Sequence, residues 1–245
     1  MAEHGVAIPS LSRTASAQRP VSGSRRVVRP VLLACGILSS LLYVAMNVFI
    51  PMLWEGYSLA SQAVSELSAI GAPTRALWVP LGIVYSLLVA AFGWGVWTSA
   101  RSNRSLRVVS ALLMAQGVFG LFWPPMHLRG VPFTVTDALH IAWSAATLLL
   151  MLLVMGFAAP ALGKRFRLYT LVTVAIFVVF GTLTGMAGPR LAANLPTPWL
   201  GVWERVNIGA YMVWVMVLAT RLLRVRHAAA VTDRPEALAA WRPWS

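Results

Sequence analysis

Two histidines and one aspartate lie close together in the chain and carry side chains that bind metal ions. His127 comes ten residues before Asp137, and His140 follows Asp137 by three residues. Residues three apart on a helix share a face, so Asp137 and His140 would point the same way. Imidazole nitrogens and carboxylate oxygens bind zinc, and a zinc-bound water is a nucleophile at neutral pH. The sequence therefore predicts zinc held by His127, Asp137 and His140, with Glu66 as a further ligand or general base.

The same residues have a purely structural explanation. Asp137 and Glu204 fall in the first turns of expected helices, where the helix dipole favours an acid. Thr134 lies three residues before Asp137, a spacing that predicts a capping box. Arg129 and Arg205 would then neutralise the two acids. On the residues alone, both explanations stay open.

A third possibility is that these residues bind a ligand. Arg129 and Arg205 would hold a phosphate or a carboxylate, because guanidinium groups pair with such anions in a bidentate manner. The residues predicted to contact this ligand are Tyr57, Ser65, Arg129, Glu204 and Arg205. If the protein is an enzyme, the predicted catalytic residues are Glu66, His127, Asp137 and His140.

Long apolar runs surround these residues and predict the elements that position them. The chain has 245 residues, of which 58% are hydrophobic and only 11% charged. Five runs without Asp, Glu, Lys or Arg approach the roughly 20 residues that a membrane-crossing helix needs; they are residues 30–54, 76–100, 108–126, 141–163 and 168–189. A sixth run, 206–220, reaches that length only by extending back through Arg205 and Glu204. The pattern predicts an all-α fold, a six-helix transmembrane bundle over residues 30–223.

The net charge of +13 is explained by membrane topology rather than by nucleic-acid binding. Sixteen of the twenty Lys and Arg residues fall in 1–29, 101–107, 164–167 and 221–245, which lie on one side of a six-span protein. The positive-inside rule makes that side cytoplasmic. We therefore expect a plasma-membrane protein that contacts lipid and no nucleic acid, with disordered cytoplasmic tails at 1–29 and 224–245.

The segment between the first two apolar runs has a helical pattern of its own. Ser58, Ser61, Ser65 and Ser68 recur at helical spacing, with apolar residues between them. This pattern predicts a short amphipathic helix over residues 58–70 on the outer side of the membrane. We expect this helix to fold over the bundle and turn Glu66 towards the histidines.

Several short motifs are shared with a known family. They are Tyr57-Ser58, Ser65-Glu66-Leu67, Pro125-Met126-His127, Asp137-x-x-His140 and Gly201-x-x-Glu204-Arg205. Over roughly residues 30–223 the chain resembles the bacterial membrane family called domain of unknown function 998. The resemblance implies a six-span bundle with these outer residues as signature positions, and it implies no particular activity. A fainter similarity is to membrane hydrolases related to alkaline ceramidase, which bind zinc; this chain lacks their His-x-x-x-His pair in a late span.

Together these features favour a multi-pass membrane protein with an outward-facing polar pocket that binds a lipid head group or a small amphiphile. The alternative is a membrane-embedded, metal-dependent hydrolase that acts on a lipid ester or amide.

Overall fold

Six long helices make up the part of the chain that the structure describes, as the apolar runs predicted. The computed structural model describes residues 23–232, and side chains within 28–224. The helices are α1 (Gly23–Phe49), α2 (Arg75–Ser99), α3 (Arg104–Leu121), α4 (Val135–Ala158), α5 (Lys164–Ala192) and α6 (Leu200–Thr232). Two short 3-10 helices, η1 (Ile50–Leu53) and η2 (Val64–Ser68), lie between α1 and α2. The prediction of an all-α fold is confirmed.

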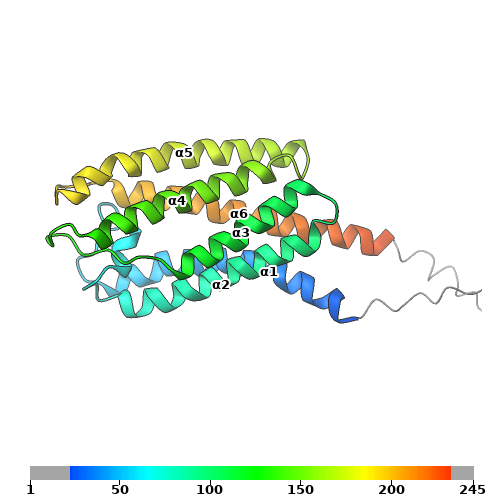
Figure 1. Cartoon of the computed structure of the whole chain (residues 1–245), viewed down its shortest axis with the longest axis horizontal. Coiled ribbons are helices and arrows are strands. Elements are labelled where there is room, and N and C mark those ends of the chain that lie inside the picture. Colours follow the sequence, from blue (N-terminus) through cyan, green and yellow to red (C-terminus); the bar gives the residue numbers. More distant parts are fainter. Residues whose placement is uncertain (1–22, 233–245) are drawn as a thin grey trace, which may run out of the picture.

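The helices run side by side in an elongated bundle (Figure 1). One end carries the connections 50–74, 122–134 and 193–199, and we call it the loop end. The other end carries the short turns 100–103 and 159–163, and it is where α1 begins and α6 ends. All residues predicted to form the functional site lie at or near the loop end.

Five of the helices are long and apolar enough to cross a membrane. These stretches are Val28–Leu53, Arg75–Ser99, Val135–Ala158, Lys164–Ala192 and Leu200–Arg224. The last of them includes Glu204 and Arg205, so the sixth apolar run does extend back through these two charged residues. The helix α3 has 18 residues and is not among the five, although it packs closely against both α2 and α4.

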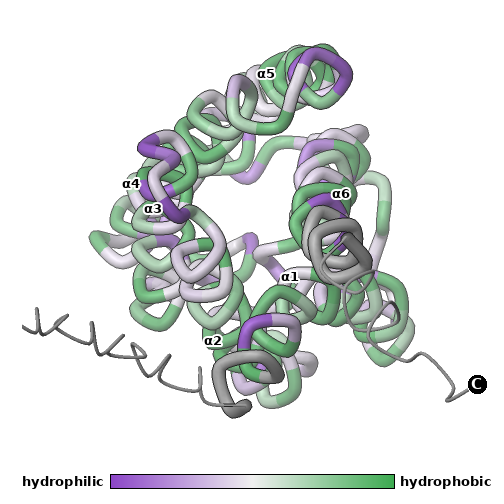
Figure 2. Tube along the Cα trace, turned by 90° about the vertical axis from the view of Figure 1, so that its right-hand side faces the viewer, coloured by the Kyte–Doolittle hydropathy of each residue, from purple (hydrophilic) through white to green (hydrophobic). Residues whose placement is uncertain are grey.

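The core lies along the bundle axis and leaves the outward faces apolar. Phe92, Leu113 and Trp214 are fully buried in the central cluster. Outward-facing side chains such as Leu41 and Val179 remain more than half exposed. Apolar residues cover most of each helix, and hydrophilic residues gather at the helix ends (Figure 2). Such apolar outer faces are suited to lipid rather than to water.

The segment 55–74 is not the amphipathic helix that the serine spacing predicted. Only Val64–Ser68 is helical, as a 3-10 turn. The rest consists of turns, bends and irregular backbone, with Ile70 in an isolated β-bridge to His127. Side chains take the backbone donors that a helix would use: Gln62 Oε1 accepts from Ser58 N at 2.8 Å, and Ser58 Oγ accepts from Ser61 N at 3.2 Å. Such local side-chain bonds compete with helical hydrogen bonds. The prediction of a helix over 58–70 is therefore wrong.

The predicted tails fall mostly outside the described residues. The helix α1 begins at Gly23 and α6 ends at Thr232, so both helices continue beyond the predicted 30–223 domain. The disorder expected in 1–29 and 224–245 concerns residues that, for the most part, the structure does not describe.

Candidate functional site

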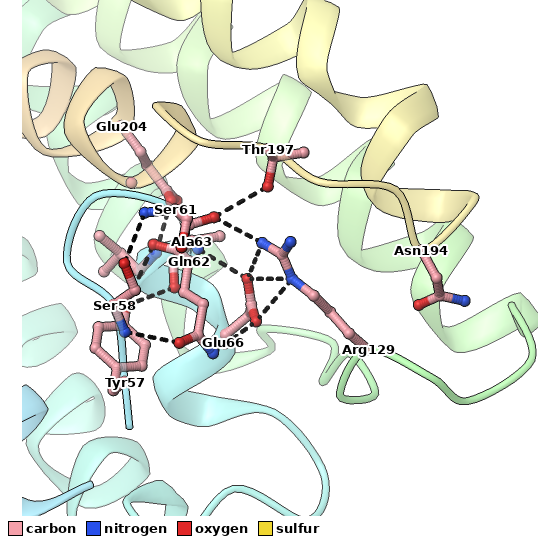
Figure 3. A network of polar contacts seen from close by, with 12 residues as sticks. Tyr57, Ser58, Ser61, Gln62, Ala63, Glu66, Arg129, Asn194, Thr197 and Glu204 are labelled. Carbon is pink, nitrogen blue, oxygen red and sulfur yellow. Dashed lines mark hydrogen bonds and ion pairs between the residues drawn. The ribbon is translucent and has the colours of Figure 1, made fainter. Parts of the chain in front are cut away.

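A buried ion pair joins the 55–74 segment to the loop before α4. Arg129 Nη2 lies 2.8 Å from Glu66 Oε1, and Arg129 Nε lies 3.2 and 3.1 Å from the two carboxylate oxygens (Figure 3). Glu66 also accepts from Ala63 N and Gln62 Nε2, at 2.8 and 3.2 Å. Arg129 Nη2 donates to Ser61 O at 2.8 Å. The Glu66 side chain is only 1% exposed, so these bonds replace the hydration that the carboxylate loses.

Glu204 and Arg205 both hold the 55–74 segment, but from different sides. Glu204 Oε2 accepts from Val64 N at 2.6 Å. Arg205 Nη1 donates to Leu59 O at 2.9 Å, and Nη2 donates to Tyr57 OH at 2.8 Å. The ion pairs found among the described side chains are Arg129–Glu66 and His127–Asp137, so Glu204 and Arg205 do not pair with each other.

A glycine makes this contact between α6 and the 55–74 segment possible. Gly201 N donates to Ala60 O at 2.9 Å. A Cβ atom at position 201 would collide with the carbonyl oxygens of Leu59 and Gln62. This contact explains why the Gly201-x-x-Glu204-Arg205 motif begins with a glycine. Only if α6 lies close to the segment can the side chains of Glu204 and Arg205 reach it.

Tyr57 is part of the same network. Its hydroxyl donates to Ala63 O at 2.8 Å and accepts from Arg205 Nη2, and the Arg205 guanidinium lies 5.6 Å from the Tyr57 ring centroid. Burial raises the pKa of the Tyr57 phenol to about 12, although Arg205 acts in the opposite direction. The phenol is therefore neutral at physiological pH and serves as both donor and acceptor.

Asp137 fixes the start of α4 and the position of His127. Thr134 and Asp137 form the predicted capping box, so that prediction is confirmed. Asp137 Oδ1 accepts from His127 N at 2.7 Å, and Oδ2 accepts from the Thr134 hydroxyl at 2.7 Å. His127 Nδ1 lies 3.2 Å from Asp137 Oδ2. Both carboxylate oxygens are thus used in holding the loop against the helix.

His140 keeps one ring nitrogen available. Its Nδ1 lies 2.8 Å from Pro124 O. A carbonyl oxygen only accepts hydrogen bonds, so Nδ1 carries the proton, and in the neutral ring Nε2 is an acceptor. The Trp123 ring packs edge-on against the imidazole, with ring centroids 5.4 Å apart. His140 is 5% exposed and lies one turn further along α4 than Asp137.

A cavity of about 270 Å³ lies at the loop end between α4, α5 and α6. Six of the nine predicted site residues line it: Ser65, His127, Arg129, Asp137, His140 and Glu204. Glu66 lies behind Arg129 and is not among the lining residues, and neither are Tyr57 and Arg205. The wall deeper in the bundle is apolar or small; it consists mainly of Ile141, Ala145, Leu148, Gly181, Gly185 and Gly188.

The comparisons with known proteins identify a family for this arrangement. A family described as "Protein of unknown function (DUF998)" matches residues 37–221, which is most of the chain. The chain belongs to the DUF998 family. No curated protein matches it, and no solved structure matches it. The similarity to alkaline ceramidases therefore has no support from these comparisons.

In this DUF998 protein the predicted zinc ligands are engaged with other protein groups. Asp137 uses both oxygens on Thr134 and His127, and His140 Nδ1 is taken by Pro124. Among the side chains that the structure describes, no group of three or more His, Cys, Asp or Glu is arranged to hold a metal ion. Zinc binding stays a prediction, because His140 Nε2 remains available and a zinc-binding histidine commonly donates its other N–H to a carbonyl.

Sequence reasoning missed part of the cavity of the DUF998 protein. Thr184, Gly185 and Gly188 on α5 form one wall, and Asn194 beyond α5 accepts from Gly130 N at 2.7 Å. Thr197, which donates to Ser61 O at 3.0 Å, was not predicted either. Only the spacing of small residues along α5 hinted at this wall, and such spacing is common in membrane helices.

Proposed function

We propose that this DUF998 protein is a multi-pass membrane protein that binds an amphiphile in the loop-end cavity. The observation that supports this role is the division of the cavity lining: polar groups sit at the loop end and an apolar wall continues between α4 and α5. A head group would contact His140, Arg129 and Glu204, and a hydrocarbon chain would lie along the apolar wall. Arg205 would act indirectly, because it holds the segment that carries Ser65.

The proposed membrane arrangement has six crossings with both chain ends in the cytoplasm of a bacterial cell, at the plasma membrane. Basic residues near the other end of the bundle, opposite the loops, support this orientation by the positive-inside rule. Within the described side chains they are Arg29, Arg101, Arg104, Arg107, Lys164, Arg165, Arg167, Arg221 and Arg224. The 18 residues of α3 would extend ~27 Å, close to the ~30 Å of a hydrocarbon core.

A pair of matched glycine variants tests the binding role. A Cβ at Gly185 would meet nothing within 4 Å, so Gly185→Leu fills the cavity without a collision at its base. Gly156 on α4 is equally open and exposed, but it does not line the cavity, so Gly156→Leu is the control. We expect Gly185→Leu to reduce tenfold or more the amphiphile that copurifies with the protein, measured by native mass spectrometry. Equal occupancy in both variants would contradict the proposal.

The alternative hydrolase would require a bound metal. Elemental analysis of protein purified without chelators separates the two roles, because a zinc hydrolase contains about one zinc per chain. Stoichiometric zinc that is lost in both His127→Ala and His140→Ala would favour the hydrolase.

A further inference from the structure

The polar groups inside the cavity are mostly hydrogen-bond acceptors. The Ser144 hydroxyl donates to His140 O at 2.8 Å, and the Thr184 hydroxyl donates to Phe180 O at 2.9 Å. Each hydroxyl has one proton and two lone pairs, so both can still accept but no longer donate. His140 Nε2 is an acceptor for the reason given above. The inner part of the cavity thus offers three acceptors on α4 and α5.

Glu204 adds a fourth acceptor from α6. Its Oε2 is bound to Val64 N, and no hydrogen bond to Oε1 is found within the described residues. The neighbouring Arg205 points away and binds Leu59 and Tyr57. Further along α6, Asn207 is 3% exposed and its Oδ1 has no hydrogen-bond partner in the described part of the chain. Its amide lies next to Gly181, which lines the cavity.

The positive charge at the cavity mouth is already neutralised. Arg129 is bound through Nε and Nη2 to Glu66, and Nη2 also donates to Ser61 O. An anionic head group would have to compete with Glu66 and would meet the acceptors further in. A quaternary ammonium head group donates no hydrogen bonds and would leave these acceptors without partners. An uncharged head group that donates several hydrogen bonds satisfies these acceptors, and it does not have to compete with Glu66 for Arg129.

The apolar wall is long enough to contact part of one hydrocarbon chain. Along α4 the lining residues run from Asp137 to Leu148, a distance of roughly 16 Å at helical rise. The helices α4 and α5 follow each other in the chain but make few contacts with each other, and residues of α4, α5 and α6 line the cavity. The end-on view shows α5 set apart from α4 (Figure 2). Bare glycines at 185 and 188 leave room beside α5. The cavity of about 270 Å³ is smaller than the ~300–1,000 Å³ typical of pockets for drug-sized ligands.

We infer that the ligand is a single-chain amphiphile with an uncharged, hydroxyl-bearing head group, its chain seated between α4 and α5 and its hydroxyls bound to Glu204, His140, Ser144 and Thr184. This inference rests on the proposed amphiphile-binding role and names the chemical class of the ligand. Monoacylglycerols and alkyl glycosides share this chemistry. Phospholipids and fatty-acid anions do not.

The test uses a monoacylglycerol that carries a photoreactive diazirine in its chain. The protein is held in phosphatidylcholine nanodiscs, because alkyl glycoside detergents would themselves be ligands. After irradiation, we expect labelled peptides to include residues 141–148 and 181–188. Unlabelled 1-monooleoylglycerol should compete at least tenfold better than oleate at the same fraction of the bilayer. Competition by oleate that is equal or better would overturn the assignment of the head group.

Two variants separate this inference from the proposed function. In the Glu204→Gln variant, the side-chain oxygen can still accept from Val64 N, but the second polar atom is a donor instead of an acceptor. The advantage of the monoacylglycerol over oleate as a competitor should therefore fall from tenfold to threefold or less. Glu55→Gln, at an exposed position, should leave the preference unchanged. Suppose that Gly185→Leu abolishes labelling but oleate competes as well as 1-monooleoylglycerol in the wild type. The inferred head group is then wrong, and the amphiphile-binding role stands. If labelling of 141–148 and 181–188 is absent or unaffected by Gly185→Leu, the inferred ligand is wrong. The binding role is then wrong as well only if Gly185→Leu and Gly156→Leu retain equal amounts of copurifying amphiphile.

Discussion

Glu66 and Arg129 lie 63 residues apart in the chain and form an ion pair that fixes the 55–74 segment over the loop end of the bundle. The Glu66 side chain is 1% exposed and that of Arg129 is 26% exposed. Removing one member of such a pair leaves a charge without its partner, which costs more than exchanging both members for neutral groups. The pair therefore contributes to a single arrangement of the loops around the cavity.

Glu66→Gln should lower the free energy of unfolding by about 3 kcal/mol, because the Arg129 charge then loses its partner in a mostly buried place. The measurement is unfolding of the purified protein, followed by tryptophan fluorescence. Glu55→Gln is the control, since Glu55 is exposed. The double variant Glu66→Gln/Arg129→Gln should be less destabilised than the sum of the single variants. Additive losses would show that the two residues act independently.

The features that sequence reasoning predicted correctly depend on residues close together in the chain. The six helices follow from the apolar runs, and the capping box follows from Thr134 and Asp137 at a spacing of three. Capping and hydrophobic length are local properties, so one sequence is enough to recognise them.

The features that were wrong or missed depend on distant partners. The 58–70 helix fails through the local bonds of Ser58 and Gln62 and also because Arg129 and Arg205 take carbonyl groups of this segment. The two arginine contacts are not visible in the serine spacing. Glu204 and Arg205 were expected to form an ion pair with each other or with a residue of another helix, but each binds the 55–74 segment instead, because adjacent residues on a helix point in different directions. The cavity exists because α4 and α5 pack loosely together, a property of tertiary structure that leaves no periodic pattern.

Arg205→Lys should loosen the 55–74 segment while the helices stay folded. A lysine has no planar fork, so it cannot reach Leu59 O and Tyr57 OH together as the guanidinium does. We expect amide hydrogen exchange in residues 57–64 to become at least tenfold faster, which corresponds to a local loss of about 1.4 kcal/mol. Arg190→Lys is the control, because the exposed Arg190 makes a single bond to Pro196 O. Equal effects of the two substitutions would contradict a special role of Arg205.

The Tyr57 phenol should affect stability at alkaline pH. Its pKa is raised to about 12 in the folded protein, mainly by burial, against about 10 for an ordinary tyrosine. Between these values the folded state holds more protons than the unfolded state, so the stabilisation present below pH 10 is lost as pH rises towards 12. The difference in unfolding free energy between wild type and Tyr57→Phe should therefore shrink from pH 9 to pH 12. A constant difference would mean that Tyr57 titrates as it does in the unfolded chain.

The orientation and the number of crossings can be tested with single cysteines in a Cys35→Ala background. Ser102 and Lys164 lie at the end of the bundle opposite the loops, and Val135 and Ala193 lie at the loop end; all four are exposed. Lys164 is preferred to Gly163, whose positive φ of 86° would strain a side chain. In intact cells, we expect a membrane-impermeant maleimide to label the cysteines at 135 and 193 but not those at 102 and 164. All four should react after permeabilisation.

Comparison of maleimide labelling at positions 102 and 135, which lie on either side of α3, shows whether this shortest helix crosses the membrane. If α3 crosses, Ser102→Cys and Val135→Cys face opposite sides and only the second reacts from outside. Equal labelling of both would mean that α3 does not cross and that the bundle has five spans. Labelling restricted to 102 and 164 would keep the six spans but reverse their direction, which would place the cavity mouth on the cytoplasmic side.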